Sequence, residues 1–536
     1  MIRLPILAVL LCFSMSTYSL TFSDTSLTAD TSHTTKGYLN DLDTLKSWIE
    51  NIHPLPFARI TEAEWNVAFK KAQQNILADT NKPAKTLAMT MATGDMLGVL
   101  KDSHTMISLG VWAEGGNINT LTLASIGEDV FVKEDLLGLI APGTRVKTIN
   151  GLLIDDVFEN AMRIAPQEGN AWLSKVRFAE KLIIPMAVAM SDSEFIYING
   201  MEYRSNSRVG KARKRGVSWE FKEGIVKLNI RSFASGSSSK YYREIHRGFK
   251  ELRKNGVDRL VIDLRGNMGG SSARMEEVIR HLTHEEVRIP IAHIKGNGAE
   301  LDTIKFEGLK LNLRNTYEGP VVVLMDGLSS SASVSFVTEF RRLNRGVVLG
   351  EPCNGPNSGT FAGSSSFRLP NSGLEIMIST ERYVLDEGYA IRSQPIKPSR
   401  WIQWSEQDLT EERDPFNAAV QDWSKSPEIG DLRKVSERES KVLWEEMEMV
   451  FSRERLWGSV REKVWSQVVE GDLCVKEAKA RGENFKQCKT ARNVMITLAL
   501  PKEMRTVFEG LIAPGRPAVL HFGIHNRMDC NVCLPK

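Results

Sequence analysis

The stretch from Val321 to Glu351 constrains the fold most, because it joins a strand pattern to a helix pattern through a run of serines. The β-branched run that begins at Val321 predicts a buried strand, and apolar residues at helical spacing predict a helix directly after the serines. A hydroxyl at such a turn lies where free backbone N–H groups and the helix dipole favour a developing oxyanion. The stretch therefore suits a nucleophilic serine. The alternative is a simple helix cap, since Ser is a preferred N-cap residue.

The segment that leads to this turn alternates between the same two patterns. Residues 225–230 and 259–264 have the character of strands, and residues 241–255 and 273–282 that of helices. Strands that alternate with helices predict βαβ units and a parallel sheet. Ligand sites in such sheets lie at the carboxyl ends of the strands.

A glycine-rich loop, DLRGNMGGS from Asp263 to Ser271, follows one of these predicted strands. Its glycines permit a close backbone approach and leave N–H groups that can point at a bound atom. A phosphate cradle is the rival interpretation, but the loop has neither a GKS or GKT ending nor a GxGxxG pattern. We therefore expect the glycine amides and the serine turn to share one rim of the sheet.

Histidine is scarce, with nine in 536 residues, so His104 can be weighed individually. It stands at the end of a predicted helix, in the sequence Lys101-Asp102-Ser103-His104-Thr105. An imidazole titrates near neutral pH and can act as a general base. The alternative is a surface histidine that satisfies the end of the helix.

The length of the chain predicts several domains. Residues 36–108 carry helical spacing and form an expected N-terminal helical domain. Residues 109–205 indicate a β module with short helices, in which Asn150-Gly151 is a hairpin signal. Residues 216–405 form the α/β core, and residues 406–536 a mostly helical C-terminal extension.

The N-terminus has the layout of a secretory signal peptide over residues 1–20, because Arg3 precedes an apolar run from Leu4 to Phe13. This predicts a secreted or periplasmic protein, with an uncleaved anchor as the second possibility. No later apolar run has the length of a stable membrane span. Four of the cysteines outside this leader lie in the extension, where they favour disulfides over a zinc site: Cys474, Cys488, Cys530 and Cys533. The fifth, Cys353, lies in the core and is expected to be free.

Composition gives no reason to propose a nucleic-acid partner, since the net charge is only +3. The basic segment from Arg204 to Arg215 lacks the interleaved aromatic residues of a nucleic-acid surface. No metal or organic cofactor is implied by any motif. The oligomeric state is not predicted.

These motifs together resemble the tail-specific, or C-terminal processing, serine proteases and their relative, the tricorn core protease. Asp102 to Thr105 is similar to the family's D-x-H-T, and Asp263 to Gly270 to its D-L-R-x-N-x-G-G loop. Ser331-Ala332-Ser333 resembles the nucleophile motif S-A-S-E, and Gly350-Glu351-Pro352 a strand ending of the family. Residues 142–151 resemble its PDZ-like module. The resemblance covers about residues 38–400 and implies a βαβ protease core like that of crotonase and ClpP.

Carried over by this resemblance, Ser331 is the nucleophile, and the amides of Ala332 and of Gly269 or Gly270 form the oxyanion hole. One branch of the family uses a lysine base, but Pro356 stands in its place. The resemblance is therefore nearer to the tricorn-like branch, in which a histidine with a neighbouring serine acts as base. His104 and Ser103 match that pair.

Two departures from the family pattern affect the site. The orienting acid is expected shortly before residues 395–399, but Arg392 stands at the matching position, which leaves Glu381, Asp386 or Glu387 as possible replacements. Val334 replaces the glutamate of the nucleophile motif. We expect an exported serine endopeptidase that acts on protein or peptide substrates. The alternatives are a catalytically silent peptide-binding scaffold and an esterase.

Overall fold

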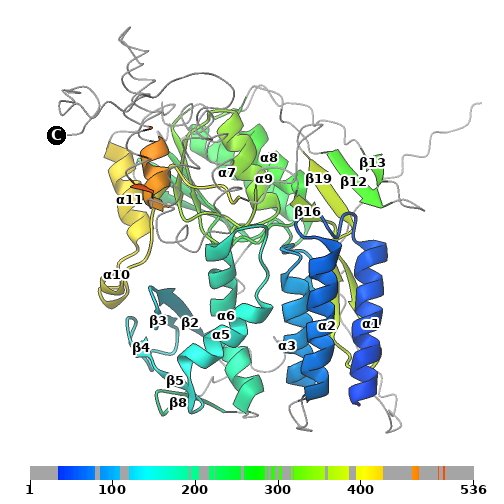
Figure 1. Ribbon diagram of the computed structural model, residues 1–536. Helices are drawn as coiled ribbons and strands as arrows, with labels where there is room; N and C mark the ends of the chain where they lie inside the picture. Colours follow the sequence, from blue (N-terminus) through cyan, green and yellow to red (C-terminus); the bar gives the residue numbers. More distant parts are fainter. Residues whose placement is uncertain are drawn as a thin grey trace, which may run out of the picture.

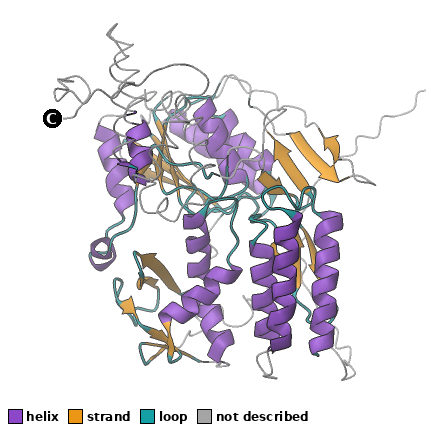
Figure 2. Ribbon diagram, viewed as in Figure 1, coloured by secondary structure: helices purple, strands orange, loops and turns teal. Residues whose placement is uncertain are grey.

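The computed structural model describes residues 34–78, 85–108, 120–191, 195–203, 216–222, 224–254, 259–283, 287, 291–295, 301–304, 316–317, 319–356, 360–384, 394–425, 462–469, 493, 496 and 499–500. Figures 1 and 2 show an α/β layer in the upper half of the view and two further groups of elements below it. One of these groups is helical and the other carries small sheets.

A six-stranded sheet forms the α/β layer, in the order β20-β15-β14-β11-β10-β9. All neighbours in this order are parallel except β9 and β10, which are antiparallel. The strands are Val217–Lys222 (β9), Ile225–Ile230 (β10), Leu260–Asp263 (β11), Val321–Met325 (β14), Val347–Gly350 (β15) and Arg400–Trp401 (β20). The predicted parallel sheet is therefore confirmed.

Helices cover both faces of this sheet (Figure 1). One face packs against α7 (Ser238–Lys254), α8 (Ser272–Arg280) and α9 (Ala332–Arg342) in a core that includes Phe249, Val278 and Phe336. The other face packs against α11 (Pro415–Lys425) through residues such as Phe416 and Trp423. A sheet buried on both faces explains why its strands are nearly all apolar.

Three helices form the N-terminal part: α1 (Thr35–Ile52), α2 (Glu62–Ala78) and α3 (Lys85–Gly98). Helix α1 buries Leu42, Leu45 and Ile49 along one side. It ends at Ile52 because Pro54 and Pro56 follow and cannot continue a helix. The helices expected in this region are thus observed.

The β module contains two small sheets, β2-β3-β4 and β6-β5-β7-β8. The expected hairpin is present, since Asn150 and Gly151 both have positive φ between β5 and β6. The expectation of short helices is met by α5 but is wrong for α6, which has 20 residues. The elements are Leu121–Ile126 (β2), Asp129–Asp135 (β3), Arg145–Val146 (β4), Thr148–Ile149 (β5), Leu152–Leu153 (β6), Ile154–Ile164 (α5), Trp172–Ser191 (α6), Ile196–Ile198 (β7) and Met201–Tyr203 (β8).

Helix α6 makes tertiary contacts through its middle and through its N-terminal part. Its middle buries Phe178, Leu182 and Met186 in the core that the helical part and the β module share. Near its N-terminal end, Arg177 forms an ion pair with Glu351, which follows β15 of the large sheet. The helix therefore links the β module to the α/β layer, as Figure 1 shows.

Distant segments also tie the N-terminal helices to the rest of the chain. Strand β1 (Met106–Ile107), just after α3, pairs with β18 (Glu375–Ile378), which in turn pairs with β17 (Ser365–Arg368). The buried carboxylate of Asp41 accepts hydrogen bonds from the backbone N–H groups of Asn371 and Ser372. A further sheet, β13-β12-β19-β16, consists of Leu301–Ile304 (β13), Ile291–Lys295 (β12), Glu381–Val384 (β19) and Thr360–Ala362 (β16).

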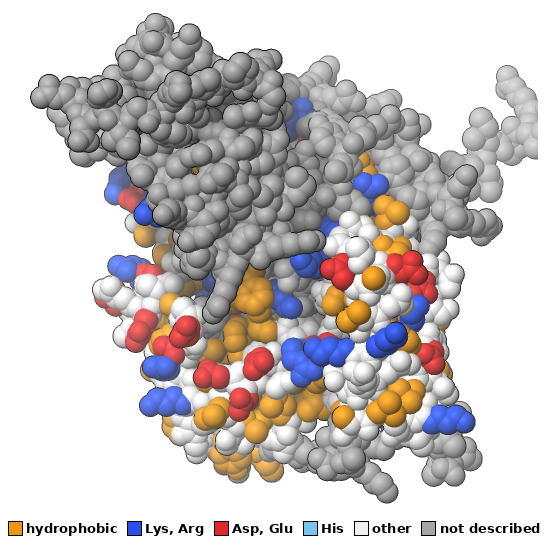
Figure 3. Space-filling model, in the orientation of Figure 1, with side chains coloured by type: hydrophobic (Ala, Val, Ile, Leu, Met, Phe, Trp, Pro, Cys, Tyr) orange, Lys and Arg blue, Asp and Glu red, His pale blue; other side chains and the backbone are white. Residues whose placement is uncertain are grey.

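The surface of the β module carries apolar side chains. Leu153, Phe195 and Met201 are each more than half exposed. On the face drawn in Figure 3, hydrophobic side chains lie among charged ones in the lower part of the molecule. Within the described residues, no helix combines the length and apolar character needed to cross a membrane.

Several expectations fall outside the described residues: the signal peptide at residues 1–20, the basic segment 204–215 and the cysteines Cys474, Cys488, Cys530 and Cys533. Most of the extension after α11 falls outside them too, and the short α10 (Glu406–Thr410) precedes that helix. Cys353 is inside them, buried and free as expected. Burial raises the pKa of its thiol to about 12.

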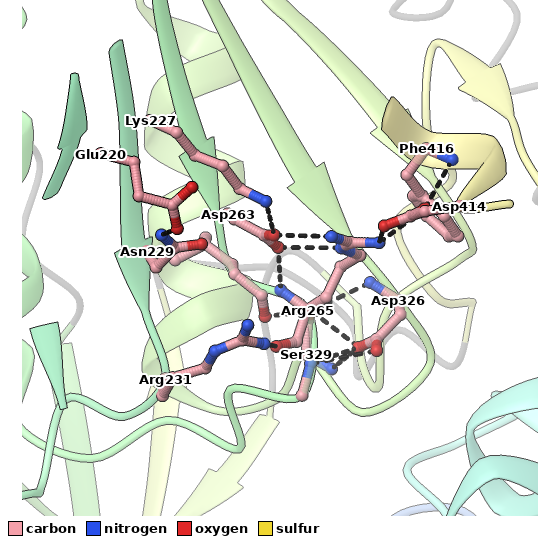
Figure 4. A network of polar contacts seen from close by, with 12 residues as sticks. Glu220, Lys227, Asn229, Arg231, Asp263, Arg265, Asp326, Ser329, Asp414 and Phe416 are labelled. Carbon is pink, nitrogen blue, oxygen red and sulfur yellow. Dashed lines mark hydrogen bonds and ion pairs between the residues drawn. The ribbon is translucent and has the colours of Figure 1, made fainter. Parts of the chain in front are cut away.

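A buried ion-pair network fixes the end of β11 (Figure 4). The guanidinium of Arg265 donates to both carboxylate oxygens of Asp263, at 3.0 and 2.7 Å, and Lys227 Nζ lies 2.9 Å from the same carboxylate. Burial opposes ionisation of Asp263, but these two cations outweigh it and hold its pKa well below the usual range. Arg265 also reaches Asp414 at 3.1 Å, where α11 begins. The network joins β10, β11 and α11.

Removing Arg265 should therefore destabilise the α/β layer. Arg265→Ala leaves the fully buried Asp263 carboxylate with Lys227 as its remaining cation, and losing one partner of a buried pair typically costs about 3 kcal/mol or more. We expect a clearly lower urea midpoint of unfolding. Arg247→Ala, which removes an exposed pair with Glu244 on α7, is the control and should move the midpoint little. Equal midpoints for the two variants would contradict the role given to Arg265.

Candidate active site

Ser331 stands at the turn between β14 and α9 in an unusual backbone conformation. It is the N-cap of α9 with φ 53° and ψ −119°. A residue with a side chain adopts this region only when its surroundings enforce it, and such strain gathers at functional sites. A sharp strand-to-helix turn of this kind presents a serine hydroxyl at the top of a sheet. Ser331 is partly exposed, whereas Ser329, Ser330 and Ser333 are buried.

The neighbouring hydroxyls serve the structure of the turn. Ser329 Oγ donates to the carbonyl of Leu264 at 2.9 Å, and Ser333 Oγ donates to the carbonyl of Asn267 at 2.8 Å. Within the described part of the chain, no hydrogen bond occupies the Ser331 hydroxyl. The geometry therefore favours Ser331 over Ser333 as the reactive serine.

The glycine loop lies directly against this turn. Ser330 N–H donates to the carbonyl of Asn267 at 3.1 Å. Gly269 has φ +100°, and a Cβ placed on it would lie 2.6 Å from Ser331 Cβ and 2.9 Å from Ala332 N. Both the conformation and the close approach demand glycine at this position.

The backbone amides beside Ser331 differ in their availability. Gly269 N–H donates to Asn267 Oδ1 at 2.9 Å. The residues on either side of Gly270 also form backbone hydrogen bonds, because Phe233 N–H donates to Gly269 O and Ser271 N–H donates to Phe233 O. The N–H groups of Gly270 and Ala332 have no acceptor among the described residues. Of the two glycines predicted for the oxyanion hole, Gly270 is therefore the one whose N–H is not already used among the described residues.

His104 lies in the loop after α3, and its side chain is 20% exposed. Its ring Nδ1 is 4.0 Å from Asp102 Oδ1, which also accepts the His104 backbone N–H at 2.9 Å. The second oxygen of Asp102 is bonded to groups from three segments, namely His53 Nε2 at 3.1 Å, Thr105 Oγ1 at 2.5 Å and Ser379 Oγ at 2.6 Å.

These contacts keep the buried Asp102 ionised. Burial by itself raises the pKa of a carboxyl group, but the hydrogen bond and charge of His53, the charge of His104 and the hydrogen bond from Ser379 outweigh it. The pKa of Asp102 is thereby held well below the usual range. A carboxylate consequently stands beside the imidazole of His104.

Glu168 is a second buried acid in this cluster, and no sequence motif marks it. Its Oε2 accepts both the backbone N–H and the hydroxyl of Ser103 at 3.0 Å, and its Oε1 is 2.7 Å from Arg59 Nη2. Potential ligand atoms of Asp102, His104 and Glu168 all lie within 4.8 Å of one another. Ser103 is thus bonded to Glu168. From sequence, Glu168 could not be told from any acid in a loop between helices.

Asn354 connects this cluster to the serine turn. Its Oδ1 accepts the Glu168 N–H at 3.2 Å, and its own N–H donates to Ser329 O at 2.9 Å, beside a bridge to Ser330. The fold therefore brings the two predicted catalytic segments together. No hydrogen bond joins His104 to Ser331 within the described residues, and catalytic contacts often tighten only when substrate binds.

Of the three acids expected to orient His104, only Glu381 lies among the described residues. Glu381 lies in β19, where its carboxyl interacts with Tyr383, and none of its contacts among the described residues reaches His104. Asp386 and Glu387 lie outside the described residues, as does Arg392. Asp102 is the carboxylate that the structure places next to the imidazole.

Comparison with known proteins finds a family match for the α/β core of the chain. The model of peptidase family S41 matches residues 224–400, which include the glycine loop and Ser331. This match indicates that the protein is a serine peptidase.

Similar solved structures include three of CPAF. Mature CPAF is 13% identical with a TM-score of 0.53, and the likeness covers 73% of this chain and 97% of that one. Mature CPAF complexed with lactacystin is 12% identical with a TM-score of 0.55, over 73% and 98% of the two chains. A CPAF mutant is 12% identical with a TM-score of 0.56, over 73% and 97%. Likeness at these identities concerns the fold.

A matched pair of glycine substitutions tests the approach of the loop to the serine turn. Gly269→Ala places a Cβ 2.6 Å from that of Ser331, so we expect peptidase activity to be lost. Gly266→Ala is the control, because Gly266 also has positive φ in the same loop but a Cβ there meets nothing within 4 Å. It should cost only the strain of the left-handed conformation, about 1–2 kcal/mol. Turnover is measured after circular dichroism confirms folding, and an active Gly269→Ala variant would refute the packing argument.

Proposed function

Since the chain is a serine peptidase, we propose that Ser331 is its nucleophile and His104 its general base, and that it acts as an endopeptidase on protein or peptide substrates. The single observation that carries this proposal is the conformation of Ser331. Its hydroxyl stands at a strained turn, beside the N–H groups of Gly270 and Ala332, which have no acceptor among the described residues. Such a turn with free amides suits acyl transfer.

In the proposed reaction, His104 takes the proton of Ser331 Oγ as the oxygen attacks the scissile carbonyl carbon. The carbonyl oxygen becomes an oxyanion and accepts hydrogen bonds from Ala332 and Gly270. His104 then gives the proton to the leaving amine, and the peptide carbonyl remains esterified to Ser331. Water, deprotonated by His104, attacks this ester and restores the free serine.

We assign the orientation of His104 to Asp102. Its carboxylate faces His104 Nδ1 at 4.0 Å and is held in place by His53, Thr105 and Ser379. A carboxylate at this position favours the tautomer that leaves Nε2 free to accept a proton, and it stabilises the imidazolium that forms. Glu168 holds Ser103 and therefore fixes the backbone next to the base.

Two features outside the catalytic cluster complete the proposal. The leader-like residues 1–20 support export, and the hairpin at Asn150-Gly151 supports a PDZ-like role of the β module in holding a peptide. We assign substrate capture to this module on that basis.

A catalytically silent scaffold is the second candidate, and one observation favours it. The nucleophile motif of the family has a glutamate where this chain has Val334, and Val334, in α9, is buried in the core. The site therefore lacks one ionisable group. An esterase that uses the same serine is distinguished only by its substrates.

Covalent labelling tests the assignment of the nucleophile. A fluorophosphonate probe should modify the wild-type chain at Ser331, and Ser331→Ala should abolish both labelling and peptide turnover. Ser333→Ala is the matched variant, because it removes only a buried hydrogen bond to Asn267 and should cost about 1 kcal/mol while the chain remains labelled. An unlabelled wild-type chain would favour the scaffold, and labelling that depends on Ser333 would shift the nucleophile by two residues.

A second test concerns the base and its carboxylate. His104→Ala should lower kcat by on the order of 10³-fold, as loss of a triad member does, and Asp102→Asn should also lower kcat strongly with a smaller effect on KM. Asp102→Asn has a further signature. The depressed pKa of Asp102 stabilises the fold above the ordinary carboxyl pKa of about 3.9, and this contribution is lost as pH falls below that value. The stability deficit of the variant should therefore shrink in acid.

Wild-type turnover in His104→Ala would remove this histidine from the mechanism. A stability deficit of Asp102→Asn that stays constant from neutral pH into acid would show that Asp102 is not an ionised partner. Turnover is followed with a quenched peptide substrate, and stability by denaturant unfolding at each pH.

A further inference from the structure

A second cluster of metal-binding side chains lies away from the serine turn, between helices α7 and α8. It consists of His246 on α7, Glu277 on α8 and His281, the C-cap residue of α8. His246 Nε2 is 3.2 Å from Glu277 Oε1, and His281 Nε2 is 3.4 Å from the same oxygen. We propose that these three residues bind a zinc ion.

Two of the three separations between the ligand atoms match those of a zinc site. Two ligand atoms bound tetrahedrally at about 2.0–2.1 Å from one zinc ion lie roughly 3.3–3.4 Å apart. The separations from Glu277 Oε1 to the two histidine nitrogens, 3.2 and 3.4 Å, agree with this value, and all three ligand atoms lie within 4.8 Å of one another. Two histidines and one glutamate are also an established ligand set for zinc. Only a small adjustment would place an ion between the three atoms.

The placement of the ligands on two helices makes the cluster a built site. Glu277 and the C-cap residue His281 are four residues apart, so they lie on the same side of the C-terminal end of α8. Both are buried, whereas the side chain of His246 is 52% exposed. An ion held there has a solvent-facing side for a water molecule as its fourth ligand.

Neighbouring groups hold two of the three ligands in position. Arg280 Nη1 lies 3.0 Å from Glu277 Oε2, which leaves Oε1 for the ion, and the His281 ring stacks on Phe249 at 4.4 Å. Such outer contacts orient the ligands of metal sites. The competing explanation is that hydrogen bonds between the histidines and Glu277 hold the cluster without any metal. The positive charge of Arg280 favours that explanation, so binding must be measured.

Zinc at this position would fasten α8 to α7. Helix α8 begins at Ser272, directly after Gly269 and Gly270 of the glycine loop. The proposed ion would therefore stiffen the helix that follows the loop next to Ser331. The proposal does not depend on the catalytic roles assigned above, because its test measures binding.

The decisive experiment is a Zn²⁺ titration of the full chain after treatment with a chelator, by calorimetry with metal analysis of the dialysed protein. We expect one saturable site in the wild type that weakens by at least about 10-fold in His246→Ala, as loss of a direct ligand should exceed the effect of an outer-shell change. His246 is the residue of choice because its exposed side chain can be removed without opening the core. Glu244→Gln, on the same helix but paired with Arg247, is the control and should bind as the wild type does.

A second variant separates this site from the cluster of Asp102, His104 and Glu168. The proposal is supported if His246→Ala weakens zinc binding and His104→Ala leaves it unchanged. It is also supported if zinc raises the Tm of the wild type and of His104→Ala but not that of His246→Ala. Absence of saturable binding, equal binding by wild type and His246→Ala, or loss of binding only in His104→Ala would each overturn it. If two zinc ions bind, the proposal requires that His246→Ala lose one of them.

Discussion

The parallel pairing of β11 and β14 is the constraint on which the site depends. Asp263 pairs with Leu324, so both strands end at the same edge of the sheet and their following loops start side by side. Hydrogen bonds from Ser329 to Leu264 and from Ser330 to Asn267 then lock the serine turn onto the glycine loop. Because parallel neighbours point their carboxyl ends the same way, a nucleophile and its oxyanion donors can come from two separate loops.

The strained backbone conformation of Ser331 can persist because the residues around it are held rigidly. A residue in such a conformation costs of order 1–3 kcal/mol. The buried hydroxyls of Ser329 and Ser333, together with the carboxylate of Asp326, which accepts the N–H of Ser329 at 3.1 Å, hold the chain on both sides of Ser331. The hydroxyl of Ser331, the proposed nucleophile, therefore has no hydrogen-bond partner among the described residues, while its neighbours are fixed. Ser329 and Ser333 thus stabilise the turn, while Ser331 is the serine proposed to react.

His104, the proposed base, is held in place by contacts between distant segments of the chain. His104 follows the N-terminal helices, which are fastened by Asp41 to residues 371–372 and by β1 to β18. Glu168 and Asn354 then connect the neighbouring Ser103 to the serine turn. Three segments that are distant in sequence must pack correctly before the proposed base can approach Ser331, so activity should be sensitive to changes far from Ser331.

Local patterns in the sequence were enough to predict strands β10, β11 and β14 of the core, the serine turn, the glycine loop and the Asn150-Gly151 hairpin, and to single out His104. Each depends on residues close together in the chain, whose periodicity and backbone preferences act locally. The partner of His104, the role of Glu168, the length of α6 and the His246, Glu277 and His281 cluster were decided by the tertiary structure alone. Their chemistry arises from burial and from contacts between distant segments: Asp102 is a buried carboxylate because His53 and Ser379 reach it, and no stretch of sequence contains all three.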